Sequence, residues 1–331
     1  VIPEFLMLFI GVIECPELPV SVSRGALQND GFVKKISEYI TKKVADKLIG
    51  MCKTEKENYE KYWDDISPFI KFGCLKDTKF CDKMNDYILF KDINDKYLTL
   101  PELLKAGDET SEGADEASSE KTEDTASDEA ADDTEKDTRK TIYYVTDVNQ
   151  QGQYIRMFKE YNMNAVILNH NIDTSFITQL EQRNQNYRFM RIDADVTDAL
   201  KEDVSEEELK DALDTLTDTF RKALKKDNLD VKVEKLKDAS VASVITLSEE
   251  GRRMQDMMKM YNMYGMDPGM FAGQETLVLN ENHPLVKFIL GNKESSNVPI
   301  ICQQLYDLAM LSHKPLSPEE MTNFVQRSNE I

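Results

Sequence analysis

Apolar residues recur at every third or fourth position through the first third of the chain, and this spacing predicts a block of helices. Runs with helical spacing cover 31–52 and 55–71, and a third lies around 79–89. The apolar face of the first run consists of Phe32, Ile36, Ile40, Val44 and Leu48. The second run carries the single tryptophan, Trp63, which we expect in the core of the block rather than on a ligand-binding surface.

The pattern then changes to short apolar runs that alternate with helical ones. Strands are predicted at 141–145, 165–169 and 187–192, with helices at 150–161 and 175–185. A βαβαβ run of this size predicts a small parallel sheet with helices packed on it. The first strand–helix turn, TDVNQQGQ, has no glycine-rich cradle for a phosphate, which argues against nucleotide binding there.

From Ser205 the pattern is that of an α+β domain. Ser205 and Glu208 form a predicted capping box for a helix that reaches about residue 224. Strands follow at 229–236, 240–247 and 276–280, with a helix from about 248. His283 precedes Pro284, which suits the first position of a helix, so we expect His283 to cap or pack rather than to act in catalysis.

The last two predicted helices each have one apolar face. The faces consist of Val298, Ile301, Leu305 and Leu308 in the first helix, and of Met321, Phe324 and Val325 in the second. The second helix begins at SPEE, with Ser317 as N-cap, proline next and Glu320 at the third position. A pair this small cannot bury both faces alone. Packing of two copies into a four-helix bundle would do so and predicts a homodimer; docking of both helices on their own domain is the alternative.

One segment, 106–138, contains no large apolar residue. Residues 108–137 carry fourteen acidic and two basic side chains, so they supply −12 of the formal net charge of −20. Such a composition cannot bury enough apolar surface to offset the entropy of ordering, and it predicts a disordered acidic linker. The linker is either a tolerated surface insertion or a tail that recruits a partner.

Composition narrows the classes of protein to which this chain can belong. At 331 residues with 40% hydrophobic positions, the chain can form two or three domains with substantial cores. The net charge argues against nucleic-acid binding. Five scattered cysteines and three separated histidines predict no metal site, no disulfide framework and a cytoplasmic location. The apolar stretch 1–12 is interrupted by Pro3 and Glu4 and is too short to span a membrane.

Seven of the fifteen methionines lie between 254 and 270. Methionine is flexible and polarizable, so a methionine-rich surface can adapt to unrelated apolar partners. The residues we expect to line such a surface are Met254, Met257, Met258 and Tyr261. Their helical spacing suits an internal helix face equally well, and both interpretations stay open.

The segment ELPVSVSRGALQND (17–30) holds Arg24 near the predicted start of a helix, with Gln28 one turn later. A guanidinium is planar, permanently charged and able to donate two parallel hydrogen bonds to an anion, which suits contact with a phosphate. Pairing of Arg24 with a nearby carboxylate, with Ser23 as a simple helix cap, explains the same pattern.

This segment resembles the catalytic loop of the heat-shock protein 90 chaperone family. It departs from the family at two positions: Ser21 stands where the family usually has asparagine, and Gly25 stands where glutamate is frequent. Three later segments are similar to family motifs in the same order: KENYEKYWDDISPFIKFGCLKD (56–77), KTIYYVTD (140–147) and LVLNENHPLVKFI (277–289). The four matches cover most of the chain outside the acidic segment, where family members have only a few residues.

The resemblance implies a middle-to-carboxyl-terminal part of a larger chaperone that lacks the ATP-binding domain. It implies a multidomain α/β and α+β fold that ends in a helix pair. The expected parts are the end of an α/β layer with the catalytic loop (1–30), a helical block (31–105), the acidic linker (106–138), a small βαβαβ subdomain (139–202) and a dimerisation domain (203–331).

The resemblance also implies an activity. ATP and Mg²⁺ would bind in the absent domain, and Arg24, supported by Gln28, would reach the γ-phosphate, so the whole protein would be an ATPase and this chain alone inactive. The partners would be a second copy and unfolded or partly folded client proteins. The alternative from another class is a non-enzymatic dimeric scaffold or adaptor that recruits partners through the acidic linker.

Overall fold

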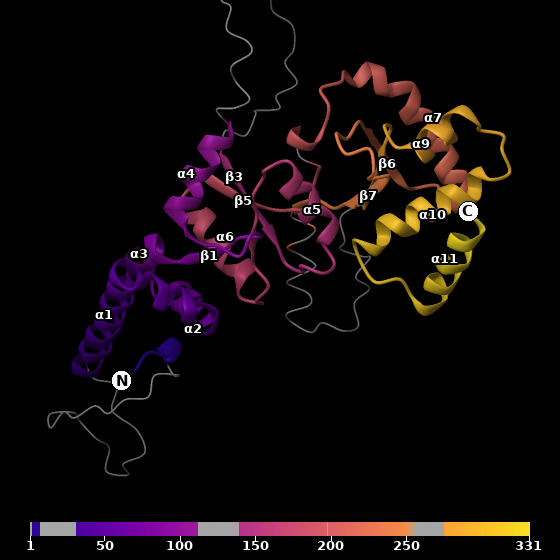
Figure 1. Cartoon of the computed structure of the whole chain (residues 1–331). Coiled ribbons are helices and arrows are strands. Elements are labelled where there is room, and N and C mark those ends of the chain that lie inside the picture. The colour runs from indigo at the N-terminus through magenta and orange to yellow at the C-terminus, as the bar shows by residue number, and fades with distance from the viewer. Residues whose placement is uncertain are drawn as a thin grey trace, which may run out of the picture. The chain divides into compact units, whose positions relative to one another are not determined.

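The fold is a mixed α/β architecture of helices and small sheets, seen in a computed structural model (Figure 1). The structure describes residues 2–6, 31–111, 139–196, 198–249, 251, 253 and 275–331. The chain divides into two compact units, one made of 1–142 with 170–189 and the other of 143–169 with 190–331. The fold class agrees with the prediction, whereas the five-part division stays a prediction.

Helices dominate the first unit. They are α1 (Gly31–Thr54), α2 (Lys56–Lys76), α3 (Thr78–Met84), α4 (Leu100–Ser111) and α6 (Asp173–Arg183), with short 3-10 turns at Glu4–Leu6 and Asn85–Tyr87. Trp63 is 2% exposed and its ring packs against that of Tyr59, so its predicted place in the core is confirmed. Helix α4 continues to Ser111, five residues beyond the predicted start of the linker at 106. Extending a helix that has already formed adds one hydrogen bond for each residue that is fixed, so polar residues can join its end.

A small hairpin in the first unit was not predicted. Strands β1 (Leu89–Lys91) and β2 (Tyr97–Thr99) pair antiparallel. The Asp92 carboxylate accepts the backbone N–H groups of Asn94 and Lys96, each at 2.8 Å, and Asp95 has a φ of 62°. Aspartate and asparagine favour such turns because their short side chains bond the nearby backbone.

The predicted alternation of strands and helices is present. The elements are β3 (Lys140–Val145), α5 (Gly152–Glu160), β4 (Val166–Ile167), α6 (Asp173–Arg183) and β5 (Tyr187–Arg191). The strands form a sheet in the order β4-β3-β5, and β3 pairs with β4 in parallel. The helix predicted at 150–161 begins two residues later than expected, at Gly152, because Gln151 is its N-cap.

The rest of the second unit is α+β. It contains a 3-10 turn at Asp198–Leu200, then α7 (Glu206–Leu224), β6 (Asp230–Glu234), β7 (Ser243–Thr246), β8 (Thr276–Asn280), α9 (Pro284–Gly291), α10 (Val298–Leu311) and α11 (Pro318–Glu330). The sheet order is β6-β8-β7, with β8 parallel to β6 and antiparallel to β7. Figure 1 shows α7, α9 and α10 gathered beside these strands.

One apolar core joins this sheet to α7, α9 and α10. Its fully or nearly fully buried members include Leu216, Phe220, Leu277, Leu279, Val286, Ile289, Cys302 and Leu305. At the start of α7, Ser205 is the N-cap but its side chain makes no capping hydrogen bond, so the predicted capping box with Glu208 is wrong. The Glu208 N–H is instead bonded to the Ser205 carbonyl at 3.1 Å, which leaves the hydroxyl without that donor.

Candidate functional site

The predicted catalytic pair, Arg24 and Gln28, lies outside the described residues. The predicted client-binding residues Met254, Met257, Met258 and Tyr261 lie outside them as well. The structure does describe the chain on both sides of the methionine-rich segment, at Glu249 and at Glu275. It also describes all seven residues of the predicted dimer interface, which lie in α10 and α11.

Helix α10 faces the core of its own chain. Val298, Ile301 and Leu305 are 2%, 6% and 1% exposed and belong to the core of the second unit. The alternative of docking on the helix's own domain therefore accounts for these three residues without a second copy. Leu308, which belongs to the same predicted apolar face, is 41% exposed and lies at the surface.

Helix α11 rests on α10 through polar contacts. The Arg327 guanidinium pairs with the Asp307 carboxylate, and the Gln304 amide donates to the Ser328 hydroxyl at 2.7 Å. Burial raises the pKa of Asp307. Met321 and Val325 are 38% and 51% exposed. Phe324 is half-buried and no residue of α11 is fully buried, so most of its apolar face is uncovered in a single chain.

The start of α11 forms as predicted. The Ser317 hydroxyl accepts the Glu320 N–H, and the Glu320 carboxylate accepts the Ser317 N–H at 2.8 Å, which completes a capping box. These bonds to Ser317 lower the pKa of Glu320. His283 likewise caps a helix, because its Nδ1 accepts the Leu285 N–H at the start of α9. Its predicted capping role is confirmed.

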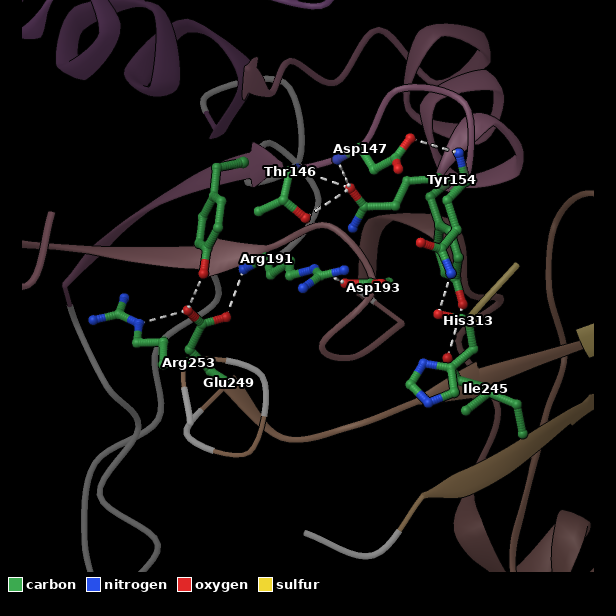
Figure 2. A network of polar contacts seen from close by, with 12 residues as sticks. Thr146, Asp147, Tyr154, Arg191, Asp193, Ile245, Glu249, Arg253 and His313 are labelled. Atoms are coloured by element: carbon green, nitrogen blue, oxygen red, sulfur yellow. Dashed lines mark hydrogen bonds and ion pairs between the residues drawn. The ribbon is translucent and has the colours of Figure 1, made fainter. Parts of the chain in front are cut away.

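A polar network precedes the methionine-rich segment (Figure 2). The Glu249 carboxylate accepts three hydrogen bonds: from the Tyr144 hydroxyl at 2.7 Å, the Arg191 backbone N–H at 2.6 Å and the Arg253 guanidinium at 2.7 Å. The Arg191 side chain instead pairs with Asp193 at 2.8 Å. Burial and the Glu249 charge raise the pKa of Tyr144, so its hydroxyl keeps the proton that it donates.

The turn between β3 and α5 lies in the same network (Figure 2). The Gln151 side chain is fully buried, and its carbonyl oxygen accepts the backbone N–H groups of Thr146 and Asp147 at 2.8 and 3.0 Å. In doubly wound folds such N–H groups at a strand–helix turn meet a ligand phosphate. Here Gln151 occupies them, so this turn offers no cradle for a nucleotide.

The far side of the methionine-rich segment is also bonded. Glu275 accepts from His313 Nε2 at 2.9 Å and faces Lys314 Nζ at 3.3 Å. The hydrogen bond with His313 is the main cause that lowers the pKa of Glu275 to about 2. The chain around His313 is itself held: the Gln150 amide donates to the His313 carbonyl, and the Ser312 hydroxyl donates to Gln153 at 3.0 Å.

The sequence did not single out Glu249, Glu275 or His313. A single carboxylate gives no periodic signal, and the partners lie far away in the sequence: 105 residues separate Tyr144 from Glu249, and 163 separate Gln150 from His313. Tyr144 does lie in the KTIYYVTD segment, so the resemblance was the one signal that pointed toward this network.

Two further properties concern the described part of the chain. In it, no group of three or more histidine, cysteine, aspartate or glutamate side chains is placed to hold a metal ion. Among the helices described there, none is both long enough and apolar enough to cross a membrane.

The chain is similar to known chaperone proteins. Chaperone protein HtpG of Bacteroides thetaiotaomicron is 33% identical over 312 residues, which are 90% of this chain and 41% of that protein. Chaperone protein HtpG of Porphyromonas gingivalis is 31% identical over 327 residues, 94% of this chain and 43% of that protein. For chaperone protein HtpG of Ruthia magnifica subsp. Calyptogena magnifica the identity is 24%, over 99% of this chain and 49% of that protein.

The chain thus spans between two fifths and one half of the length of these relatives. A family model described as Hsp90 protein matches residues 1–113 and 115–331, which leaves out one residue. The family suggested by the four sequence segments is confirmed: the chain belongs to the Hsp90 family.

Proposed function

We propose that this chain supplies the middle and carboxyl-terminal regions of an ATP-dependent chaperone that acts as a homodimer on unfolded or partly folded clients. The observation that carries the proposal is the match of the family model along nearly the entire chain. The relatives named above as chaperones, at 31–33% identity over 90% or more of the chain, support the same activity.

In this proposal ATP and Mg²⁺ bind to a part of the whole protein outside this sequence. One observation fits that placement: the Gln151 side chain fills the turn in which a phosphate would lie. Bound ATP supplies the phosphoryl group that is transferred to water. Arg24 contacts the γ-phosphate and stabilises the negative charge that develops there, and Gln28 supports it.

The catalytic role of Arg24 is tested in the full-length protein. Arg24→Ala should lower the ATPase rate by about a hundredfold or more, as loss of one charge-stabilising donor does elsewhere, while ATP affinity changes little. Arg24→Lys is the matched variant, since it keeps the charge but loses the bidentate geometry. Equal ATPase rates in wild type and Arg24→Ala would refute the assignment.

Client binding is assigned to the methionine-rich segment, with Met254, Met257, Met258 and Tyr261 as its contact residues. The double substitution of Met257 and Met258 by aspartate should weaken binding of an unfolded client while the thermal melt stays close to that of wild type. Val148→Asp, at a position that is 46% exposed, controls for an added surface charge. A collapsed melt in the double variant would favour the internal helix face instead.

The acidic segment favours a second candidate, a dimeric adaptor that binds a basic partner through its −12 charge. Deletion of 112–138 leaves all of α4 and distinguishes the two functions. A chaperone should keep its client binding and its dimer after the deletion. An adaptor should lose its main partner.

A further inference from the structure

We propose that Asp307 and Gln304 of α10 are positioning residues for self-association of this chain: they hold α11 where its exposed apolar residues lie beside the exposed apolar residue of α10. The inference rests on the homodimer proposed above and adds residues on which that dimer depends. Neither side chain belongs to the apolar surface itself. All of the residues concerned lie in the described part of the chain.

Helix α11 is held mainly by its contacts with α10, beside which it lies in Figure 1. It has 13 residues, none of them buried, and Phe324 of its apolar face is half-buried. An isolated helix of this length is only marginally stable in water, so the position of α11 depends on its neighbour. Among the described residues, two polar contacts join α11 to another element: Arg327 with Asp307, and Ser328 with Gln304.

The carboxylate on α10 is itself fixed in place. Asp307 is 5% exposed; one of its oxygens accepts the Gln303 amide at 3.0 Å, and the other faces the Arg327 guanidinium. One residue earlier, the Tyr306 hydroxyl accepts Lys226 Nζ, just after the end of α7, at 2.6 Å. A charge-assisted hydrogen bond is about twice as strong as a neutral one, so a carboxylate held in this way defines where the Arg327 side chain lies.

The contact of Gln304 with Ser328 sets the register of the helix pair. Leu308 follows Gln304 by one turn of α10 and therefore lies on the same side of that helix. Val325 precedes Ser328 by one turn of α11, and Met321 precedes Val325 by another. The two helices run in opposite directions, so the contact brings Leu308 and Val325 to the same level.

The resulting surface, made of Leu308, Met321 and Val325, is exposed and apolar. By helical spacing, the acidic residues of α11 lie on its other faces: Glu319, Glu320 and Glu330. Charged residues are depleted at the centres of protein interfaces. A chain with a net charge of −20 repels its own copy over much of its surface, so this uncharged face suits a second copy, which presents the same face across a two-fold axis.

Loss of either contact should loosen α11 without unfolding the domain. The buried residues of α10 pack against the core of their own chain and do not depend on α11: Val298, Ile301 and Leu305. Met321 and Val325 would still be present, but they would no longer be held beside Leu308. A second copy would then have to order α11 as it binds, and this cost lowers the affinity.

Two substitutions test the two contacts. Asp307→Asn keeps the shape of the side chain and removes the charge that faces Arg327. Ser328→Ala removes the contact with Gln304 at an exposed position, so it tests the inference even if the buried Asp307 variant melts early. Asp211→Asn is the matched control, because it makes the same chemical change as the first variant at an exposed position of α7.

The experiment measures two quantities for the full chain and each variant. Hydrogen exchange of the α11 amides reports how firmly α11 is held, and Met321→Glu with Val325→Glu serves as the background, so that self-association does not contribute. The dissociation constant of the dimer is measured without that background, by sedimentation velocity over a concentration series. Asp307→Asn should raise the exchange rate and the dissociation constant about tenfold each, because a hydrogen bond to a charged group is lost. Ser328→Ala should raise both to a smaller degree, and Asp211→Asn should change neither.

The outcomes separate this inference from the function on which it rests. Unchanged exchange of the α11 amides in both variants would overturn the positioning role, whatever happens to the dimer. Faster exchange with an unchanged dissociation constant would show that α11 is held by these contacts but that its position does not matter for association. A wild-type chain that is monomeric at every concentration would refute the homodimer itself, and with it the association half of this inference.

Discussion

Asn280 shows how one residue can account for a sequence motif. Its side chain is fully buried and uses its complete hydrogen-bonding capacity. The amide NH₂ donates to the carbonyls of Asp238 and Val241, at 3.0 and 2.7 Å, and the amide oxygen accepts the N–H groups of Leu236 and Asn282 at 3.0 Å. The asparagine of LVLNENHP thus fastens the β6–β7 connection to the end of β8, while His283 starts the next helix.

Replacing Asn280 by alanine leaves buried donors and acceptors without partners. Each such group costs about 1–3 kcal/mol, so we expect the free energy of unfolding to fall by about 3 kcal/mol or more. Urea denaturation measures this difference. Asn292→Ala is the control, because the Asn292 amide donates to the Phe288 carbonyl at the surface, and that variant should stay within about 0.5 kcal/mol of wild type.

Glu275 makes stability depend on pH in acid. Its pKa falls from 4.5 to about 2 on folding, so the folded state favours the charged carboxylate. The stabilisation is therefore complete above about pH 5 and is lost as the pH falls through 4.5 toward 2, with an upper limit of about 3 kcal/mol. Unfolding of wild type and Glu275→Gln between pH 6 and pH 2.5 should show a stability gap that closes in acid. A constant gap would contradict this linkage.

At the scale of elements, a buried ion pair joins two helices of the first unit. Lys71 of α2 and Asp173 of α6 are 2.5 Å apart, with side chains that are 7% and 4% exposed. Asp173 also accepts the His170 N–H at 3.0 Å, and the Lys71 ammonium lies 6.0 Å from the centre of the Phe176 ring. Each charge is thus compensated by the other in a site from which water is excluded.

Breaking this pair should cost more than removing it. Lys71→Met leaves the Asp173 carboxylate buried and alone, which we expect to cost about 3–5 kcal/mol of unfolding free energy. The double variant Lys71→Met with Asp173→Asn should recover most of that loss, because it buries no uncompensated charge. A double-mutant cycle in urea measures the coupling. Additive losses would mean that the two charges are stabilised by other groups.

Elements with a regular period were predictable, and those specified by single side chains were not. The helices of 31–84, the β3–β5 alternation and the α11 capping box follow from spacing and cap residues. The β1–β2 hairpin was not predicted, because its strands have only three residues each and its turn depends on the Asp92 carboxylate. Ser205 and Glu208 have the spacing of a capping box, yet the geometry of the helix start does not bring the two groups together.

The faces of the last two helices could be predicted, but the partners of those faces could not. Periodicity gives the apolar residues of α10 and cannot distinguish a second chain from the helix's own domain. The structure buries Val298, Ile301 and Leu305 within one chain and leaves the surface of α11 exposed. For the catalytic loop and the methionine-rich segment, both outside the described residues, the sequence predictions stay predictions.

At the scale of the whole molecule, the uncovered face of α11 is where a second copy would bind in the proposed homodimer. Met321→Glu with Val325→Glu changes only exposed positions, whereas truncation before Val298 would remove core residues as well. We expect light scattering to show a dimer for wild type and a monomer for this variant at micromolar concentration. The melting temperature of the folded monomer should be the same in both proteins. Gln326→Glu, at an exposed position of α11, is the control for added charge. A dimer in all three proteins would place the interface elsewhere.

The position of β8 bears on how this protein is made. Strands β6 and β7 do not pair with each other; each pairs with β8, which enters between them although it is encoded last. While the ribosome is still synthesising residues up to 280, both earlier strands have unpaired edges, the feature that promotes aggregation of nascent chains. A protein of a chaperone family therefore passes, during its own synthesis, through a stage in which it needs protection itself.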